Sequence, residues 1–392
     1  MTQLLEPLEP RQLLASAAYP TANEQYVVEL INRARANPLA EAARLGIELN
    51  EGLAAGTISS APKQPLAIGP METFAARGHS QWMIDNNEFS HTGANNSSPF
   101  NRMGAAGVNF VAPYTWGENI GYRSQKPTVP NQTTTAAKVH DDLFIDEGIA
   151  GRGHRTGLLN PNFKLIGAGI VSGEFDTFNA VMLTTDFSAI GTNQHLLTGV
   201  AYSDVVTKDN FYTPGEGMNQ VMITAVRIGD GSTTSTKTFA SGGYTLALGA
   251  GKWIVSATGG GFGTTVMRSA IVMGEDNVKQ DFRPESDGIV RGRVFNDTNH
   301  NGVQDAGENG IPNVTVYLDT HGDGKRNRSE IYARTNADGA YAFRSMAPGT
   351  YRVRQTLPTN YRLVAPVSGV FTVKLGAGKT ATGNNFADEL IV

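Results

Sequence analysis

The first strong pattern along the chain is helical. Apolar side chains recur every three or four residues over residues 27–34, the spacing that gathers them on one face of an α-helix: Val27, Leu30, Ile31 and Ala34. Thr21 and Glu24 stand ahead of this run as a capping box, in which each side chain accepts a hydrogen bond from the other residue's backbone amide. Pro38 ends the run, because proline cannot continue a helix from within.

Two more helices and a pair of strands follow this first helix. Residues 71–86 carry apolar side chains on one side, as a helix packed on a core does: Met71, Phe74, Ala75, Gly78 and Trp82. Residues 134–146 predict a third helix that stops before a glycine-rich loop. Residues 166–171 and 181–185 are apolar runs that predict paired strands at the centre of the domain.

Beyond about residue 198 the pattern changes to short strands separated by turns, with no amphipathic helix. Val314, Val316 and Leu318 alternate with other residues, as expected for a half-buried strand. Four pairs of short segments reveal an internal repeat: residues 199–204 and 292–297, 215–216 and 307–308, 242–244 and 339–341, and 251–253 and 349–351. We therefore expect two successive β-sandwiches of ordinary size, roughly 90 to 105 residues each.

Composition narrows the class of protein. A chain of 392 residues is too long for one ordinary domain, so two or three are expected. Hydrophobic residues make up 40% and charged residues 17%, with 45 Gly, which indicates a folded and loop-rich chain. The net charge of −4 offers no basic face for nucleic acid, and no long apolar run predicts a transmembrane segment. Because cysteine is absent, disulfides and thiolate metal sites are excluded, and zinc would need His, Asp or Glu.

Residues 1–18 do not form an ordinary secretory signal, because no long apolar core follows a basic start. Residues 8–14, Leu-Glu-Pro-Arg-Gln-Leu-Leu, resemble the LEPR-x-LL motif found near the N-terminus of exported and surface bacterial proteins. The alternative is a disordered tail with a chance similarity. We expect export.

Three short motifs place a histidine or an acid beside glycine. Residues 89–93 read Phe-Ser-His-Thr-Gly, residues 117–120 Gly-Glu-Asn-Ile, and residues 151–155 Gly-Arg-Gly-His-Arg. Glycine lets the backbone bend tightly and present the neighbouring side chain to solvent. The motifs predict that His91, Glu118 and His154 lie on separate loops and converge on one cleft.

Residues 23–187 resemble the CAP superfamily of cysteine-rich secretory proteins, antigen 5 and pathogenesis-related 1, in its bacterial SCP-like branch. The resemblance rests on those motifs together with residues 30–35 and 166–169, in the family's order. It implies an α-β-α sandwich whose central cavity is lined by two His and one or two acids, which here would be His91, Glu118 and His154. The family's second acid is poorly matched; Asp146 is the best candidate, with Glu147 behind it.

Neutral imidazoles bind Zn²⁺ well, and a catalytic zinc keeps a position open for water. We therefore take His91 and His154 as candidate zinc ligands in the cavity, with Glu118 and Asp146 as candidate catalytic acids. The alternative is a structural hydrogen-bond network that holds the cavity loops without metal.

Residues 297–308 fit the twelve-residue calcium loop, which needs oxygen donors at fixed positions and a glycine for the turn. The donors are Asp297, Asn299, Asn301, Val303 through its carbonyl, Asp305 and Glu308. Residues 319–330 form a second loop with Asp319, Asp323, Lys325 through its carbonyl, Asn327 and Glu330. His321, at its third position, is a poor calcium ligand. The alternative for each loop is an Asx-rich turn without an ion. We expect one or two structural calcium ions, which would neutralise carboxylates and stiffen the domain.

The expected fold class is α+β, with a CAP-type α-β-α sandwich followed by two all-β Ig-like or transthyretin-like sandwiches. The expected segments are 1–18 (targeting or disordered), 19–192 (CAP), 198–284 (carboxypeptidase-regulatory-like sandwich) and 287–392. The last resembles the B-type domains of serine–aspartate-repeat adhesins and would bind calcium.

These features predict an extracellular or cell-surface bacterial protein. Its cavity would bind a small ligand, such as a lipid or peptide, or a divalent metal, and its sandwiches would serve as stalk or adhesive modules toward a cell-surface or matrix partner. The alternative function is a zinc-dependent, peptidase-like hydrolase acting through His91, His154 and Glu118, with Glu118 as general base. A third interpretation makes the chain a purely structural envelope spacer. Whether it is an enzyme stays open at this point.

Overall fold

The computed structural model describes residues 19–191, 195–283, 288–327, 330–346, 349–376 and 378–391. The export motif predicted at residues 8–14 lies outside these residues. By the density of its contacts the chain divides into two compact units. Unit 1 takes its described residues from Met1–Gln220, Lys237–Ala250 and Met273–Asp281, and unit 2 from Val221–Thr236, Gly251–Val272 and Phe282–Val392.

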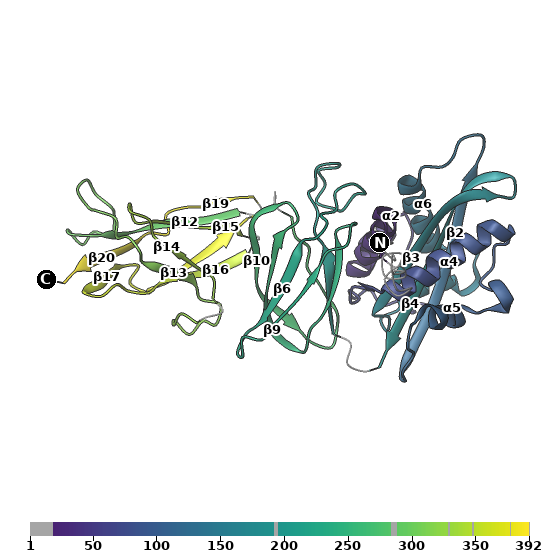
Figure 1. Ribbon diagram of the computed structural model, residues 1–392, viewed down its shortest axis with the longest axis horizontal. Coiled ribbons are helices and arrows are strands. Elements are labelled where there is room, and N and C mark those ends of the chain that lie inside the picture. Colours follow the sequence, from purple (N-terminus) through teal and green to yellow (C-terminus); the bar gives the residue numbers. More distant parts are fainter. Residues whose placement is uncertain are drawn as a thin grey trace, which may run out of the picture. The chain divides into compact units, whose positions relative to one another are not determined.

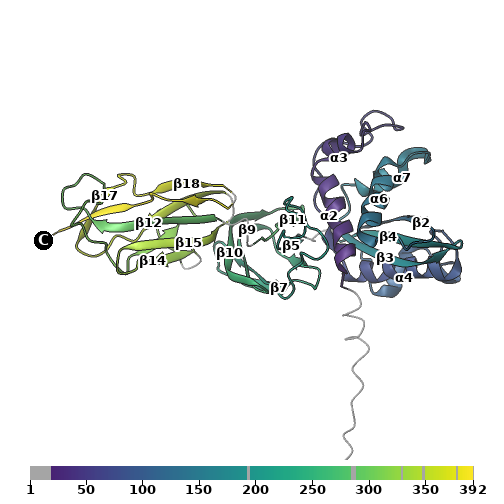
Figure 2. The ribbon, with the colours of Figure 1, turned by 90° about the horizontal axis from the view of Figure 1, so that it is seen from above.

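The N-terminal part of unit 1 is a three-layer α-β-α sandwich. Its sheet has the order β1-β3-β4-β2, with bounds Ala67–Ile68, Leu165–Phe175, Phe178–Ile190 and Tyr114–Gln125. Only the short β1–β3 pairing is parallel. Helices α2 (Ala22–Ala36) and α6 (Gln132–Ile145) cover one face and helices α4 (Pro70–Asn86) and α5 (Pro99–Ala106) the other (Figures 1 and 2). The predicted sandwich is confirmed.

The three long helices begin and end close to the predicted positions. The capping box of α2 is present, since Thr21 Oγ1 accepts from the amide of Glu24 at 3.3 Å and Glu24 Oε2 accepts from the amide of Thr21 at 2.7 Å. Helices α4 and α6 start one and two residues before their predicted first residues. Short helices were not predicted: α3 (Pro38–Arg44), α5 and α7 (Gly153–Leu158).

Two locations of the predicted site residues need correction. Glu118 was expected on a loop but lies within the twelve-residue strand β2, and His154 lies in the first turn of α7. Only His91 lies on a loop between regular elements. Strand β2 escaped prediction because Gly117 and Gly121 interrupt its apolar pattern; a Cβ at these glycines would overlap Phe163 and Val139.

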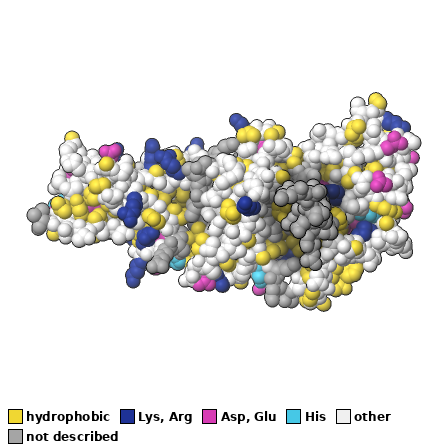
Figure 3. All heavy atoms as spheres, viewed as in Figure 1, with side chains coloured by type: hydrophobic (Ala, Val, Ile, Leu, Met, Phe, Trp, Pro, Cys, Tyr) yellow, Lys and Arg dark blue, Asp and Glu magenta, His cyan; other side chains and the backbone are white. Residues whose placement is uncertain are grey.

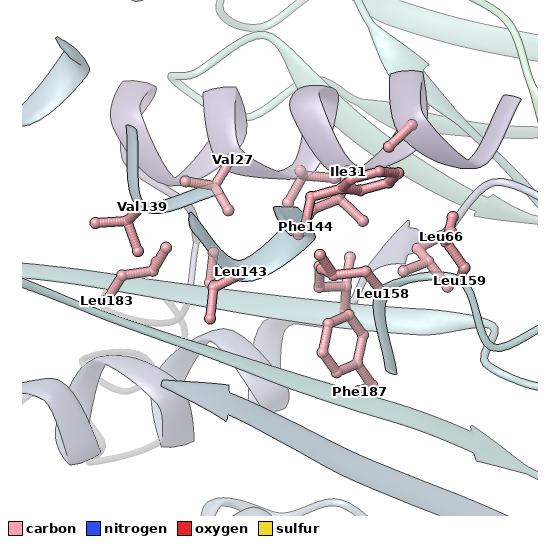
Figure 4. Packing of buried hydrophobic residues seen from close by; sticks show 14 of the residues in the cluster. Val27, Ile31, Leu66, Val139, Leu143, Phe144, Leu158, Leu159, Leu183 and Phe187 are labelled. Atoms are coloured by element: carbon pink, nitrogen blue, oxygen red, sulfur yellow. The ribbon is translucent and has the colours of Figure 1, made fainter. Parts of the chain in front are cut away.

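The main hydrophobic core lies between the sheet and the α2–α6 layer. Val27 and Ile31 of α2 meet Leu143 and Phe144 of α6 above Leu183 of β4 (Figure 4). Each of these side chains is less than 6% exposed. Burying a side chain of this size contributes about 1.5–3 kcal/mol, so the apolar stripe of α2 fixes the helix on the sheet.

On the opposite face, α4 packs directly on the backbone of β3. A Cβ at Gly167 would overlap the backbone of Glu72 and Thr73, and one at Gly169 would overlap the backbone of Arg77. The Gly-Ala-Gly sequence at residues 167–169 is therefore needed for this close approach of helix and strand.

The rest of unit 1 adds the sheet β11-β5-β8, with bounds Val278–Lys279, Leu196–Val200 and Gly243–Ala247. An ion pair and side-chain hydrogen bonds join this sheet to the α-β-α sandwich. Lys279 Nζ lies 2.9 Å from Glu29 Oε2 of α2 and also pairs with Asp281. Burial opposes the charge on Lys279, but Asp281 and Glu29 together raise its pKa. Asn277 donates to the carbonyls of Lys164 at 2.7 Å and Pro65 at 3.0 Å.

Unit 2 is entirely β in its described residues. Its strands are β6 (Met222–Arg227), β7 (Thr233–Lys237), β9 (Gly251–Gly259), β10 (Phe262–Met273), β12 (Gly288–Asn296), β13 (Thr315–Leu318), β14 (Tyr332–Arg334), β15 (Ala340–Met346), β16 (Gly349–Gln355), β17 (Tyr361–Ala365), β18 (Phe371–Leu375), β19 (Thr380–Ala381) and β20 (Phe386–Leu390). Val314, Val316 and Leu318 are buried in its core, as their alternation predicted. The fold class, a CAP-type sandwich followed by all-β sandwiches, is confirmed.

The charge distribution agrees with the composition. On the face shown in Figure 3, acidic and basic side chains are scattered among uncharged ones, without a large field of one sign. In the part of the chain that the structure describes, no helix combines the length and apolar character needed to cross a membrane.

Candidate functional site

Strand β2 is an edge strand, and it places consecutive residues on opposite faces of the sheet. Ile120 packs with Met83 of α4 and Met182, so Glu118, two residues earlier, points to the α4–α5 side. Asn119 points to the other side, where its Nδ2 donates to the carbonyl of His154 at 3.2 Å. The predicted site therefore has two halves, one on each side of β2.

The first half is built around the carboxylate of Glu118. Its Oε1 accepts from Nδ1 of His91 at 2.8 Å, and its Oε2 accepts from Nη2 of Arg102 at 2.5 Å. The side chain of Glu118 is 1% exposed, whereas that of His91 is 52% exposed. Arg102 also donates through Nη1 to the carbonyls of His91 and Ser97, which holds the His91 loop against α5. A buried acid thus fixes two donor groups that reach the surface.

Electrostatics keep Glu118 ionised. Burial alone would raise its pKa, but hydrogen bonding by His91 and the charge of Arg102 outweigh burial and lower the pKa of Glu118. His79 of α4 lies behind it, with Nε2 4.0 Å from Glu118 Oε1. Burial lowers the pKa of His79, and its Nε2 donates to the carbonyl of Ser90 at 2.8 Å. His79 is thus a neutral, buried support of the His91 loop.

Aromatic side chains border this half along β2. Trp116 and Tyr114 share the face of Glu118 and are 40% and 47% exposed. Phe100 of α5 lies 6.0 Å from the Trp116 ring and stacks on Phe110 at 4.4 Å. The polar centre therefore adjoins an exposed aromatic surface.

The second half pairs His154 with Asp146. Asp146 ends α6 in a left-handed conformation, φ 53°, and its Oδ2 accepts from the amide of His154 at 2.8 Å. Its Oδ1 accepts from His154 Nδ1 at 2.7 Å. The neighbouring Arg155 is fully buried and donates to the carbonyls of Phe144, Ile145, Leu49 and Glu51. Asp146 is thus a hydrogen-bond partner of His154, and Arg155 stabilises the segment before α7 through its hydrogen bonds to backbone carbonyls.

The predicted trio of His91, Glu118 and His154 does not form one close cluster. Among the described residues, one group of three acidic or histidine side chains has ligand atoms within 4.8 Å of one another: Glu41, His140 and Asp141. Arg33 and Arg44 already neutralise Glu41 there, at 2.7 Å each. This cluster is a buried ion-pair network that joins α2, α3 and α6.

Two members of the site escaped sequence reasoning. Arg102 lies on the unpredicted helix α5, so nothing in the spacing indicated it. Asp186 lies on β4, directly opposite Glu118 in the β2–β4 pairing, and is fully buried. A signal for Asp186 existed, since an acid inside the apolar run of residues 181–187 must be buried in a central strand.

The first predicted calcium loop has the oxygen donors that calcium prefers. Glu308 accepts from the amides of Thr298 at 2.8 Å and Asp305 at 3.0 Å, and Asp297 accepts from the amide of Gly302 at 2.8 Å. The side-chain amides of Asn299 and Asn301 both donate to Asp305 at 2.7 Å. These contacts draw the donors into one loop whose chemistry fits calcium.

The second predicted calcium loop differs at its first ligand. Asp319 is buried, and its Oδ2 accepts from Nε of Arg354 at 2.7 Å. His321 Nδ1 lies 3.0 Å from Oε1 of Glu330. A guanidinium therefore already supplies positive charge to this loop, so its donors fit calcium less well than those of the first loop.

Comparisons with known proteins agree with this architecture. The model of the cysteine-rich secretory protein family matches residues 28–187, and the SdrD B-like domain model matches residues 288–384. An uncharacterized protein of Bacillus subtilis (strain 168), YkwD, is 35% identical over 108 residues, which are 28% of this chain and 35% of that protein. The chain thus spans about a third of this relative's length.

Two solved structures are similar at a coarser level. An extracellular protein containing an SCP domain from Bacillus anthracis str. Ames is 22% identical, with a TM-score of 0.26, over 47% of this chain and 44% of that one. GBS52, the minor pilin of Streptococcus agalactiae, is 15% identical, with a TM-score of 0.25, over 50% of this chain and 97% of that one. By the two family-model matches, residues 28–187 form a CAP domain and residues 288–384 an SdrD B-like domain.

Proposed function

We propose that this chain is an extracellular or cell-surface protein whose CAP domain binds a small ligand beside His91, Glu118 and Arg102. Its C-terminal sandwich would serve as a calcium-stiffened stalk or adhesive module. The two domain matches support this proposal. The export motif at residues 8–14 points the same way.

The observation that carries the proposal is the buried carboxylate of Glu118 between two groups that reach the surface. With Nδ1 bound to Glu118, the exposed ring of His91 keeps Nε2 for a ligand. Arg102 Nε has no hydrogen-bond partner among the described residues. That nitrogen is buried, so a ligand contact with Arg102 would use another part of the guanidinium; the side chain as a whole is 12% exposed.

The chemistry of this surface suits a small amphipathic ligand. A carboxylate or peptide carbonyl can accept from Arg102 and, when the ring is protonated, from His91. The exposed rings of Trp116 and Tyr114 can cover an apolar part of the same ligand. A lipid carrying a carboxylate and a short peptide both meet these requirements.

Binding is tested with two probes, a fluorescent fatty acid and a fluorescently labelled peptide mixture. His91→Gln should weaken binding of the preferred probe about tenfold, because a charge-assisted hydrogen bond is lost. His300→Gln is the matched control, since His300 is also exposed and pairs with a Glu at 3.0 Å, but in unit 2. Equal binding by both variants and wild type, or no binding of either probe, would contradict the proposal.

Zinc is a separate question at this site. His91 and His154 are the expected ligands, and each directs Nδ1 at a carboxylate and leaves Nε2 free of that contact, but they lie in separate halves of the site, so one zinc shared by both would require the two halves to come together. Bound zinc would supply a Lewis acid. Elemental mass spectrometry after dialysis against zinc decides the matter: stoichiometric zinc lost in a His91→Ala/His154→Ala variant supports a metal site, and no zinc in wild type excludes one. We do not propose hydrolysis, because Arg102 and His91 already occupy both oxygens of the candidate base, Glu118.

A further inference from the structure

Strand β2 has one edge that no described strand covers. It is the last strand of the sheet β1-β3-β4-β2, and its pairing with β4 runs from Tyr114 to Gln125 without a register shift. The opposite edge, β1, has two residues and is covered, since the carbonyl of Ile68 accepts from Thr245 Oγ1 of β8 at 3.1 Å. Proteins commonly interrupt a long edge with a bulge or a proline, because its free amides and carbonyls attract another chain. Strand β2 has neither.

The hydrogen bonding at the start of β2 shows which main-chain groups face outward. In an antiparallel pair, every second residue directs both its amide and its carbonyl at the partner strand, and the residues between direct theirs away. Gly191 donates to the carbonyl of Pro113 at 2.8 Å, and this pair continues the register of β2 and β4. Counting from Pro113, the odd-numbered residues therefore face β4, whereas Tyr114, Trp116 and Glu118 direct amide and carbonyl outward.

The first half of this outward edge is accessible. Tyr114 and Trp116 are 47% and 40% exposed. Glu118 is partly exposed although its side chain is 1% exposed, so the exposed surface of this residue is main chain. In the described part of the chain, no hydrogen bond reaches the outward amides and carbonyls of these three residues. Ile120, the next outward residue, is 5% exposed and ends the accessible stretch.

The accessible edge runs through the proposed ligand site. The side chain of Glu118 lies on the α4–α5 side, where His91 and Arg102 bind its carboxylate. Asn119 lies on the other side, where it contacts His154. A strand added alongside β2 would direct alternate side chains to these two sides. Both halves of the site would therefore border the same peptide.

The length of the accessible edge favours a peptide over a second copy of this chain. The five residues 114–118 extend about 17 Å. A contact confined to so short an edge gives little of the ~1,200 Å² that a stable interface between two proteins buries. A short extended peptide needs no more than this edge, because its main chain supplies matching donors and acceptors. The exposed rings of Trp116 and Tyr114 can cover apolar side chains at its alternate positions.

We propose that the CAP domain binds an extended peptide of about five residues as an added strand along residues 114–118 of β2. Main-chain hydrogen bonds provide affinity that does not depend on sequence, and apolar side chains at alternate positions of the peptide pack against Trp116. This inference rests on the proposed function, since it names the ligand class of the same site.

The first test uses the full chain and the tightest-binding peptide of the labelled mixture, synthesised with one N-methyl group at each position in turn. An N-methyl group removes a donor and adds bulk to the main chain. Binding should therefore weaken at least about tenfold at every second position, where the amide faces β2, and change less than about twofold at the positions between. Uniform losses, or none, would overturn the added strand, although a ligand site at His91 would stand.

Amide hydrogen exchange, followed by NMR in the full chain, gives the second readout. Saturating peptide should slow exchange about tenfold or more at Trp116 and Glu118, whose amides point outward. The amides of Thr115 and Gly117 face β4 and should change less than about twofold, so they are the internal controls. Equal protection of both sets, or of neither, would contradict an added strand.

The remaining outcomes separate this inference from the proposed function. Binding of the fatty acid but of no peptide would overturn the added strand and keep a ligand site at His91. Binding of neither probe would overturn both. Protection of the outward amides that appears without peptide, rises with protein concentration and coincides with a dimer in light scattering would place a second copy on the edge, and would overturn the peptide.

Discussion

The two β-repeats share the same tyrosine hydrogen bond and close glycine contact, which we call their common frame. They differ in the contacts made by the loop that ends at Glu216 in the first repeat and at Glu308 in the second. In each, a tyrosine hydroxyl donates to a backbone carbonyl: Tyr244 to Gln280 at 2.5 Å, and Tyr341 to Asn384 at 2.6 Å. In each, a glycine has positive φ where a Cβ would overlap a strand carbonyl: Gly242 at 86° and Gly339 at 73°. The repeat inferred from short sequence segments is therefore a repeat of hydrogen bonds and close contacts.

The loops diverge in what they carry. Glu216 and Glu308 both fold their loops by accepting from backbone amides. Around Glu308 the remaining positions are Asp and Asn, which suit an ion. The loop before Glu216 instead carries Phe211, which packs on Tyr26 and Arg33 of α2, and Tyr212, which donates to the carbonyl of Ala22 at 3.3 Å.

This difference separates two roles of an acid in such a loop. The last Glu is retained in both repeats because it satisfies backbone amides, a task that needs no ion. The loop of the first repeat keeps Asp204 and Asp209 but not the regular spacing of donors, whereas residues 297–308 have the full set. A retained Glu is thus weak support for calcium, and the full donor set is strong support.

The largest expected effect comes from breaking the shared frame. A Cβ at Gly217 would overlap the carbonyl of Ser241, and one at Gly310 would overlap that of Asp338. Gly217→Ala and Gly310→Ala should each destabilise the protein by ~3 kcal/mol or more, because backbone must move. Calorimetry measures this, with Gly274→Ala as control, since nothing lies within 4 Å of a Cβ there. A change no larger than the control would contradict a common frame.

Calcium binding should distinguish the loop of residues 297–308 from the corresponding loop of the first repeat. At calcium 100-fold above Kd, binding to residues 297–308 should stabilise the protein by ~2.7 kcal/mol relative to chelator. Asp297→Ala should abolish this increment, whereas Asp204→Ala, at the corresponding position of the first repeat, should leave it unchanged. The measurement is the thermal midpoint of each variant with calcium and with EDTA. An increment that survives Asp297→Ala would place the ion elsewhere.

The smallest effect concerns the loop of residues 319–330. Arg354→Leu removes the guanidinium from Asp319 and should tighten calcium binding there about tenfold, ~1.4 kcal/mol, because a competing cation is gone. Isothermal titration should then detect an additional ion. Arg352→Leu is the control, since its Nε lies 3.8 Å from Asp319 and its side chain is 46% exposed. Equal calcium binding in both variants would mean that Arg354 does not compete.

Much of the fold could be predicted from local patterns. Helix α2 was predictable because its apolar spacing, capping box and terminal proline all agree. Strand β2 was not, because glycines that admit Phe163 and Val139 break its pattern, and these partners are distant in sequence. The short helices α5 and α7 have too few residues to show a period.

The histidines of the site could be predicted from the sequence, but Arg102 and Asp186, the residues packed around Glu118, could not. The motifs indicated His91, Glu118 and His154, and the pairs His91–Glu118 and His154–Asp146 lie within hydrogen-bond distance. They could not show that Glu118 and Asn119 face opposite sides of an edge strand, because that depends on the strand itself. Arg102 and Asp186 reach Glu118 only through tertiary packing.

The contact between Lys279 and Glu29 bears on whether the CAP domain can be separated from the sheet that follows it. Glu29 is buried on α2, and the lysine that neutralises it follows 250 positions later, on β11. A gene fragment that stopped after the CAP domain would keep the acid and lose its counter-ion. Separating the CAP domain from residues 273–281 would therefore leave a buried acid without its lysine, so unit 1 is costly to divide between them.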